Sequence, residues 1–200
     1  MSRYQKNIDW NAVAEMKIRS VRMDFGFVKA TEGVTYTDPL FKRNWQSMER
    51  TRMVRGAYHY FKPSLDGKKQ ADHFIRQVDL RPGDLPPVLD VEELDNGSPA
   101  QLVEGVRKWI DRVEQHYKVK PVIYAGADFY NKYLFAHFSK YPLWVAHYYQ
   151  PCEPRVLSGW KFWQHNDRGR INGIAAPVDF NVFHGSRESF DALRIKRTIP

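Results

Sequence analysis

Apolar runs alternate with amphipathic stretches along most of this chain, and this alternation limits the folds that it can adopt. Six apolar runs have the length and composition of β-strands, at residues 25–30, 54–60, 87–91, 121–125, 143–148 and 161–165. Four stretches between them have helical periodicity, at residues 10–16, 39–52, 67–77 and 99–117. Strands that alternate with helices are typical of an α/β protein built on parallel strands.

The pattern changes after Tyr141, where short strand-like segments follow one another through connections rich in Pro, Gly and Asn. About five strand-helix units followed by three bare strands predict an irregular TIM-like barrel. Functional groups of such barrels gather at the C-terminal ends of the strands. We expect residues 1–200 to form one catalytic domain, because no linker or low-complexity segment interrupts them.

The chain is basic, with 31 Lys and Arg against 23 Asp and Glu and a formal net charge of +8. This excess favours a polyanionic partner. Because no nucleic-acid-binding motif accompanies the charge, we expect no nucleic-acid partner. No run approaches the ~20 apolar residues of a membrane span, and the first ten residues lack the apolar core of a signal peptide. The single Cys152 excludes an intrachain disulfide.

The segment 85–93 is an apolar strand that ends in carboxylates. Side chains of a strand alternate between its two faces, so Asp90 and Glu92 point the same way, whereas Val91 and Glu93 point the other way. Hydrolysis of a glycosidic bond needs such a pair, and the repulsion between close like charges keeps one carboxyl protonated near neutral pH. Helix capping, surface charge or metal binding are the alternative interpretations of this short motif.

Aromatic residues favour the hydrolytic interpretation. Six of them fall at or near the ends of predicted strands, where they could line a groove and stack on sugar rings, with packing in the core as the alternative. They are Tyr58, Tyr60, Tyr124, Trp144, Tyr148 and Trp163. Four histidines near strands, His59, His147, His165 and His184, lack the spacing of metal ligands. No nucleotide-binding or serine-hydrolase motif is present.

The chain resembles the muramidases of glycoside hydrolase family 25 over essentially its full length. The resemblance rests on ordered motifs: IDW at 8–10, FVKATEG at 27–33, DPxF at 38–41, RGAYHY at 55–60, PPVLDVE at 86–92, PVIY at 121–124, LWVA at 143–146, FWQ at 162–164, and GI at 173–174 with VDFN at 178–181. It implies a barrel of five strand-helix units plus three strands. It also implies cleavage, with retention, of the β-1,4 bond between N-acetylmuramic acid and N-acetylglucosamine, without a metal or organic cofactor.

The resemblance also implies roles for individual residues. Glu92 matches the family's acid/base, and Asp90 matches the carboxylate that orients the acetamido group of the substrate, whose oxygen is the nucleophile in the favoured scheme. Asp179 matches a further carboxylate of the cleft. The positions that match substrate-facing residues are Tyr58, Tyr124, Trp144 and Gln164, to which the aromatic pattern adds Tyr60.

One departure affects the first strand of the family's domain. Family members usually begin this strand with Asp-Val-Ser or a similar segment. Here Met1 replaces the residue before Ser2, so the aspartate of that strand is absent, and residues 2–5 resemble the tail of the strand. A catalytically impaired wall-binding module is therefore one alternative, and a hydrolase of another N-acetylated polysaccharide such as chitin is a second. We expect a monomer that acts on peptidoglycan in the periplasm or outside the cell.

Overall fold

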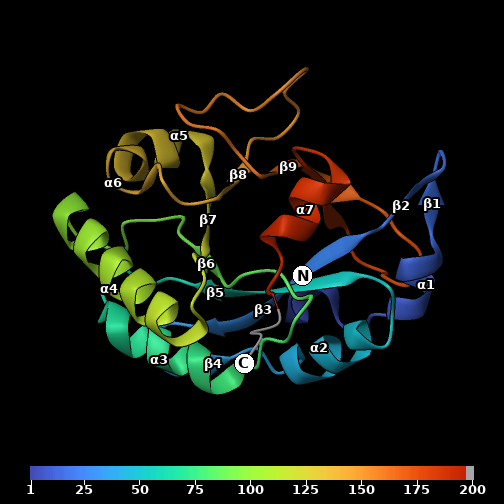
Figure 1. The fold of residues 1–200 in the computed structure, drawn as a ribbon, viewed down its shortest axis with the longest axis horizontal. Coiled ribbons are helices and arrows are strands. Elements are labelled where there is room, and N and C mark those ends of the chain that lie inside the picture. Colours follow the sequence, from blue (N-terminus) through green and yellow to red (C-terminus); the bar gives the residue numbers. More distant parts are fainter. Residues whose placement is uncertain (197–200) are drawn as a thin grey trace.

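An eight-stranded sheet curls around the centre of the molecule and is flanked by helices (Figure 1). The computed structural model describes residues 1–196. The strands of this sheet are β3 (Phe25–Glu32), β4 (Tyr36–Thr37), β5 (Val54–Tyr60), β6 (Val88–Asp90), β7 (Val122–Gly126), β8 (Leu143–Ala146), β9 (Phe162–Gly169) and β10 (Val178–Phe183). Their order is β4-β3-β5-β6-β7-β8-β9-β10, and only the two end strands run antiparallel to their neighbours.

Most of the helices pack on the outer side of the sheet, but the last of them packs against its inside. The helices are α1 (Trp10–Glu15), α2 (Phe41–Glu49), α3 (Gly67–Gln77), α4 (Pro99–Tyr117), α5 (Ala127–Phe129), α6 (Phe135–Phe138) and α7 (Arg187–Leu193), with a 3-10 turn η1 (Arg3–Gln5) and a π-helical turn η2 (Tyr130–Leu134). A two-stranded hairpin of β1 (Lys17–Ile18) and β2 (Val21–Arg22) projects from the body (Figure 1). None of the helices in residues 1–196 is long and apolar enough to cross a membrane.

All six expected strands are present, and the helices expected at 67–77 and 99–117 are confirmed as α3 and α4. The start of α4 is a capping box, in which Ser98 and Gln101 each bond the other's backbone N–H, followed by Pro99 at the first helical position. The expected helices 39–52 and 10–16 are shorter in the structure. The hairpin, the short helices at 127–138 and α7 were not expected.

The expected TIM-like barrel is present only as a curled, open sheet. Within residues 1–196, β10 and β4 are the two ends of the strand order. Four strand-helix units precede the three final strands, instead of the expected five. Met1 lies at the outer edge of β3, where its N–H donates to Phe27 O and its carbonyl accepts from Lys29 N, both at 2.8 Å. Residues 2–5 do not continue this pairing, because Ser2 caps the 3-10 turn η1.

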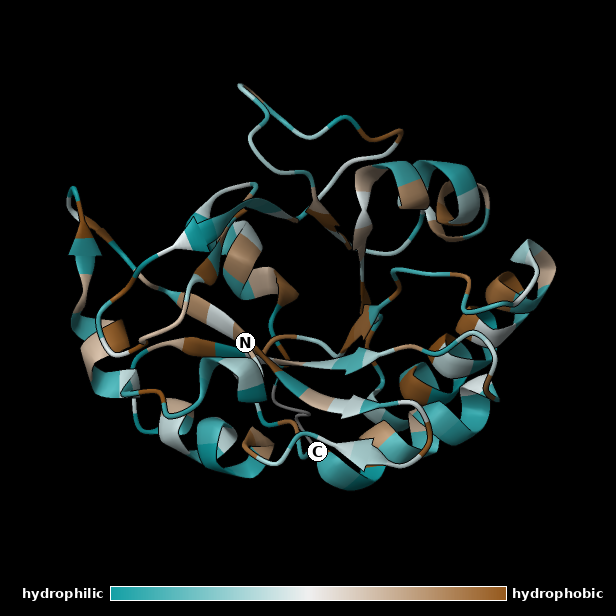
Figure 2. Ribbon diagram, turned by 180° about the vertical axis from the view of Figure 1, so that it is seen from behind, coloured by the Kyte–Doolittle hydropathy of each residue, from teal (hydrophilic) through white to brown (hydrophobic). Residues whose placement is uncertain are grey.

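Two apolar layers fix the position of the site. The larger lies between the sheet and the helices, and Figure 2 shows that the outer sides of these helices are hydrophilic. The smaller fills the inside of the curled sheet with Phe27, Val88, Val122 and Phe162, and Phe190 of α7 packs into it. These residues occupy the N-terminal parts of the strands, so polar side chains line the inside only toward the C-terminal ends.

Candidate active site

The register of the parallel strands brings the expected site residues into two rows on the inner face. Asp90 of β6 pairs with Tyr124 of β7, which pairs with Trp144 of β8. The next row, two residues further along each strand, contains Gly126, Ala146 and Gln164 as direct partners. Glu92 follows Asp90 by two residues, just beyond the end of β6.

The expected alternation holds for Asp90 and Val91, at the end of β6. Val91 is buried in the outer core, and the Glu93 carboxylate accepts hydrogen bonds from Lys62 Nζ at 2.7 Å and from the Tyr60 hydroxyl at 3.2 Å. Asp90 is only 6% exposed, and its Oδ1 has no hydrogen-bond partner, whereas Glu92 is exposed. The two carboxyl groups thus lie close together, with Asp90 buried and Glu92 exposed.

The buried carboxyl is the one whose protonation changes. Burial raises the pKa of Asp90 well above its usual range, and the nearby charge and hydrogen bond of Glu92 raise it further, against the opposing effect of the Lys29 ammonium. We expected repulsion between like charges to keep one of the two carboxyl groups protonated. In the structure, burial is the main effect, and it favours the protonated form of Asp90.

Three tyrosine hydroxyls surround this pair. Burial and the charges of Asp90, Asp179 and Glu92 raise the pKa of Tyr58. Burial also raises the pKa of Tyr124, and the charges of Asp90 and Glu92 raise it further. The Tyr124 hydroxyl shares a hydrogen bond with the Tyr148 hydroxyl. Each hydroxyl therefore stays protonated and able to donate.

Tyr148 was named as an aromatic residue near a strand end but was not among the expected site residues. Burial raises its pKa to about 12, and Asp179 and Glu92 are the carboxylates that add to this rise. Its backbone is held on both sides, because His147 N donates to Gln164 O and Tyr149 N donates to His165 O. Tyr148 lies two residues beyond Ala146, so strand alternation alone places it on the face of Trp144.

Tyr60 lies in a charged cluster at the mouth of the site. The ammonium groups of Lys29 and Lys62 lie 4.7 and 5.0 Å from the centre of its ring. Lys29 donates to Glu32 at 2.7 Å, and Lys62 binds Glu93. The ring of Tyr60 is therefore engaged by cations, and its role as a surface for sugar stacking stays a prediction.

The two tryptophans differ in their positions. Trp144 lies inside the sheet, stacked on Phe27 at 4.2 Å, and its Nε1 donates to Asn181 Oδ1. Trp163 was expected near the groove but lies in the outer core, with its Nε1 donating to the carbonyl of His147. The alternation of β9 places the neighbouring Gln164 on the inner face, where its Oε1 is buried without a partner.

Asp179 is exposed on β10 and borders an apolar cavity of about 380 Å³ between β3 and β10. Its charge acts on both Tyr58 and Tyr148, so it belongs to the same group of residues as Asp90 and Glu92. Asp38 lies near them but is buried, and its carboxylate accepts from the backbone N–H groups of Arg3 and Leu40 at 2.9 Å. These bonds give Asp38 a structural role.

The histidine near the site is structural. The ring of His59 bonds Thr31 and Gln70, and burial lowers its pKa to about 3, so it is neutral. Among residues 1–196, no group of three His, Cys, Asp or Glu side chains is arranged to hold a metal ion. The chemistry that the arrangement supports is proton transfer by carboxyl groups beside aromatic and hydroxyl side chains.

Comparisons with known proteins agree with this arrangement. The sequence profile of glycosyl hydrolases family 25 matches residues 1–174. The uncharacterized protein YegX of Escherichia coli K12 is 48% identical over 192 residues, which are 96% of this chain and 71% of YegX. Lysozyme M1 of Streptomyces globisporus is 33% identical over 208 residues, covering 96% of this chain and 69% of that protein. A family 25 glycosyl hydrolase from Bacillus anthracis is similar in structure, with a TM-score of 0.87, 32% identity and coverage of 97% and 91% of the two chains.

The fold and these relatives thus define a glycoside hydrolase of the lysozyme type. The chain belongs to glycosyl hydrolases family 25.

Proposed function

We propose that this protein is an N-acetylmuramidase, which cleaves the β-1,4 bond between N-acetylmuramic acid and N-acetylglucosamine in peptidoglycan. The Asp90–Glu92 pair carries the proposal, because it puts a protonated buried carboxyl beside an exposed one at the C-terminal ends of the strands. The names of relatives such as lysozyme M1 and the N,O-diacetylmuramidase of Chalaropsis support peptidoglycan as the substrate. Because that polymer lies outside the inner membrane, the protein acts in the periplasm or outside the cell, as a monomer.

In the proposed reaction, the proton held by the pair is on Glu92 when the glycosidic oxygen approaches. Glu92 donates this proton as the C1–O bond breaks, and the acetamido oxygen of the same sugar attacks C1 to form an oxazolinium ion. Asp90, now a carboxylate, accepts the acetamido N–H through its free Oδ1. Water then attacks C1 as the C1–O bond of the oxazolinium ring breaks and the acetamido group is restored, and the water gives its proton to Glu92. Each step inverts C1, so the configuration is retained overall.

The remaining carboxylate and the polar side chains bind the substrate in this proposal. Asp179 adds negative charge opposite the pair, which stabilises the positive charge that develops at C1. Tyr58 and Tyr124 donate hydrogen bonds, and Gln164 accepts one. Trp144 forms the floor beneath them, and Tyr60 lies at the rim.

Digestion of purified peptidoglycan and chitin in parallel tests the proposed function. Mass spectrometry of the new reducing ends should show N-acetylmuramic acid from peptidoglycan and little release from chitin. Release from chitin at an equal rate would instead identify a hydrolase of another N-acetylated polymer. Binding of peptidoglycan without cleavage would identify a wall-binding module.

The variant Glu92→Gln tests whether Glu92 is the general acid. General acid catalysis contributes about 10²–10⁴-fold in rate, so this variant should lose at least that factor while it retains its fold and wall binding. The adjacent Glu93→Gln is the matched control, because its amide oxygen still accepts from Tyr60 and Lys62. Loss of activity in Glu93→Gln alone would exclude Glu92 as the acid.

A further inference from the structure

A guanidinium group lies between two tyrosine rings near the start of the chain. The guanidinium carbon of Arg3 is 5.2 Å from the centre of the Tyr4 ring and 5.5 Å from the centre of the Tyr36 ring. Both distances are within the range of cation–π attraction. Arg3 and Tyr4 are exposed, and Tyr4 exposes 70% of its surface, so the two rings restrict the guanidinium without adding to the core. Arg3, Tyr4 and Tyr36 are called the rim cluster below.

The backbone that carries the rim cluster is fixed by hydrogen bonds. Arg3 N donates to Asp38 Oδ2 at 2.9 Å, and Ser2 and Gln5 form a capping box around η1. Tyr36 lies on β4, which pairs with the end of β3. The guanidinium is therefore positioned before any ligand binds, which reduces the entropy that is lost on binding.

A row of cations and rings connects the rim cluster to the carboxyl pair. The Lys29 ammonium lies 5.8 Å from the centre of the Tyr36 ring and 4.7 Å from the centre of the Tyr60 ring. The same ammonium opposes the rise in the pKa of Asp90. Met1 pairs with β3 in the parallel direction, so η1 follows at the C-terminal end of that strand. The rim cluster thus borders the site on the side of β3 and β4.

The cations of this row differ in their partners. Lys29 is paired with Glu32, and Lys62 is paired with Glu93, each at 2.7 Å. No carboxylate of residues 1–196 forms a salt bridge with Arg3. A guanidinium offers N–H donors in a planar fork, which binds a carboxylate through two parallel hydrogen bonds. The rim cluster is therefore suited to a carboxylate that belongs to a ligand.

We propose that the rim cluster binds a carboxylate of the peptide stem of peptidoglycan. Muramic acid carries this stem, a short peptide with free carboxylates, as a substituent of its ring. A glycan strand bound beside the carboxyl pair places a stem at the edge of the site, where Arg3 forms a bidentate ion pair with it. The enzyme then prefers strands with stems. This inference rests on the proposed function, since only a strand that contains muramic acid brings a stem to Arg3.

Removal of the stem and removal of the guanidinium together test this assignment. In the inactive background of Glu92→Gln, proteins with Arg3 and with Arg3→Gln are compared by calorimetry. The ligands are soluble peptidoglycan strands that carry stems and the same strands after an amidase has removed the stems. We expect Arg3→Gln to weaken binding of the stem-bearing strands by about five- to tenfold and to leave binding of the stem-free strands within about twofold. Arg3→Lys should show an intermediate loss, because an ammonium keeps the charge but not the planar fork.

Arg76 provides the matched control, because it is exposed on α3, which packs on the outer side of the sheet. Arg76→Gln removes the same charge and should bind both kinds of strand as the background protein does. The proposal is overturned by an unchanged affinity in Arg3→Gln, by a loss that is equal for both kinds of strand, or by a loss that Arg76→Gln reproduces. Failure of the protein with Glu92 intact to cleave peptidoglycan would contradict the proposed function instead, and the binding comparison reports separately on Arg3.

Discussion

Burial of the Asp90 carboxyl lowers the stability of the folded protein, because the ionised form of a buried carboxyl is poorly solvated. Because its folded pKa is raised above the unfolded value of about 3.9, its contribution to stability is complete below that value and is lost as the pH rises through the folded pKa. Asp90→Asn mimics the protonated acid without this dependence. We expect the variant to lose most activity and to be more stable than wild type at pH 7 by about 1–3 kcal/mol.

Thermal melting at pH 4 and pH 7 checks this prediction, since the stability gain of Asp90→Asn should be larger at pH 7. The exposed Asp111 on α4 supplies the control, and Asp111→Asn should show no comparable difference between the two pH values. A variant Asp90→Asn that is less stable than wild type at pH 7 contradicts the pKa argument.

Tyr124 and Tyr148 act as a pair, because the hydrogen bond between them leaves one hydroxyl proton free for the cleft. We expect Tyr148→Phe and Tyr124→Phe each to reduce kcat by roughly tenfold, and the double variant to lose less than the product of the two. Steady-state kinetics of the four proteins on peptidoglycan measures this coupling. Losses that multiply would show that the two hydroxyls act independently.

At the scale of elements, α3 and α4 approach each other closely where two glycines meet. A Cβ added to Gly67, at the start of α3, would lie 2.0 Å from the carbonyl oxygen of Gly105 in α4. We expect Gly67→Ala to force the helices apart and to destabilise the protein by about 1–3 kcal/mol. Urea denaturation of this variant beside Gly126→Ala checks the prediction, because the second substitution meets open space and should leave stability unchanged.

Sequence periodicity was sufficient to predict those helices and strands whose local conformational preference agrees with their packing in the fold. The apolar stripe and the Ser98 capping box of α4 predict its bounds, and the alternation at Asp90 and Glu92 predicts the carboxyl pair. The segment 127–138 was not predicted, because its π-helical turn breaks helical periodicity. The core position of Trp163 also required the structure, since the sequence does not reveal which face of β9 turns inward.

The open sheet and the register of the site could not be predicted for a related reason. Closure depends on pairing between the first and last strands, which are far apart in the sequence, and no local pattern specifies it. The row of Gly126, Ala146 and Gln164 depends on the register of three strands. Local sequence therefore predicts which side chains face the site, and only long-range register shows which of them share a row.

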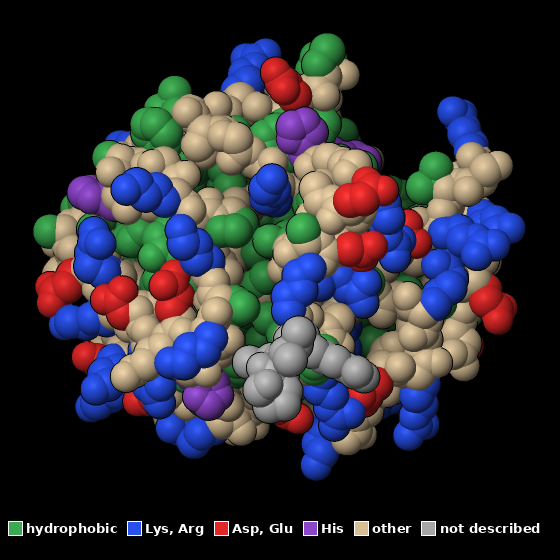
Figure 3. All heavy atoms as spheres, viewed as in Figure 1, with side chains coloured by type: hydrophobic (Ala, Val, Ile, Leu, Met, Phe, Trp, Pro, Cys, Tyr) green, Lys and Arg blue, Asp and Glu red, His purple; other side chains and the backbone are tan. Residues whose placement is uncertain are grey.

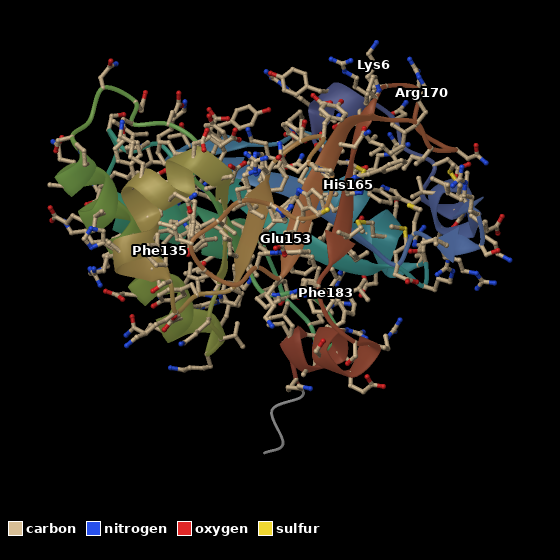
Figure 4. All side chains as sticks on the ribbon, turned by 90° about the horizontal axis from the view of Figure 1, so that it is seen from above. Lys6, Phe135, Glu153, His165, Arg170 and Phe183 are labelled. Atoms are coloured by element: carbon tan, nitrogen blue, oxygen red, sulfur yellow. The ribbon has the colours of Figure 1, made fainter. Side chains whose placement is uncertain are left out.

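At the scale of the whole molecule, basic residues are dispersed over the surface. Figure 3 shows Lys and Arg side chains spread across one face, and Figure 4 places Lys6 and Arg170 at the same edge of the molecule. The formal net charge is +8, whereas the residues grouped at the site include the carboxylates Asp90, Glu92 and Asp179. This distribution fits the proposed anionic substrate, which the basic surface would attract over a long range and the site would bind through local contacts.

This separation predicts that wall binding weakens with salt while binding within the site does not. Exposed charges interact over about 8 Å at physiological ionic strength and only about 3 Å at 1 M salt, so the surface contribution to wall affinity should largely disappear at 1 M. The measurement is sedimentation of the inactive Glu92→Gln variant with purified cell walls at increasing salt, beside sedimentation with uncharged chitin. Any binding to chitin should be unaffected by salt, because that polymer carries no charge for the surface to attract. Wall affinity that is equal at low and high salt would show that contacts within the site, and not the basic surface, hold the enzyme on its polymer.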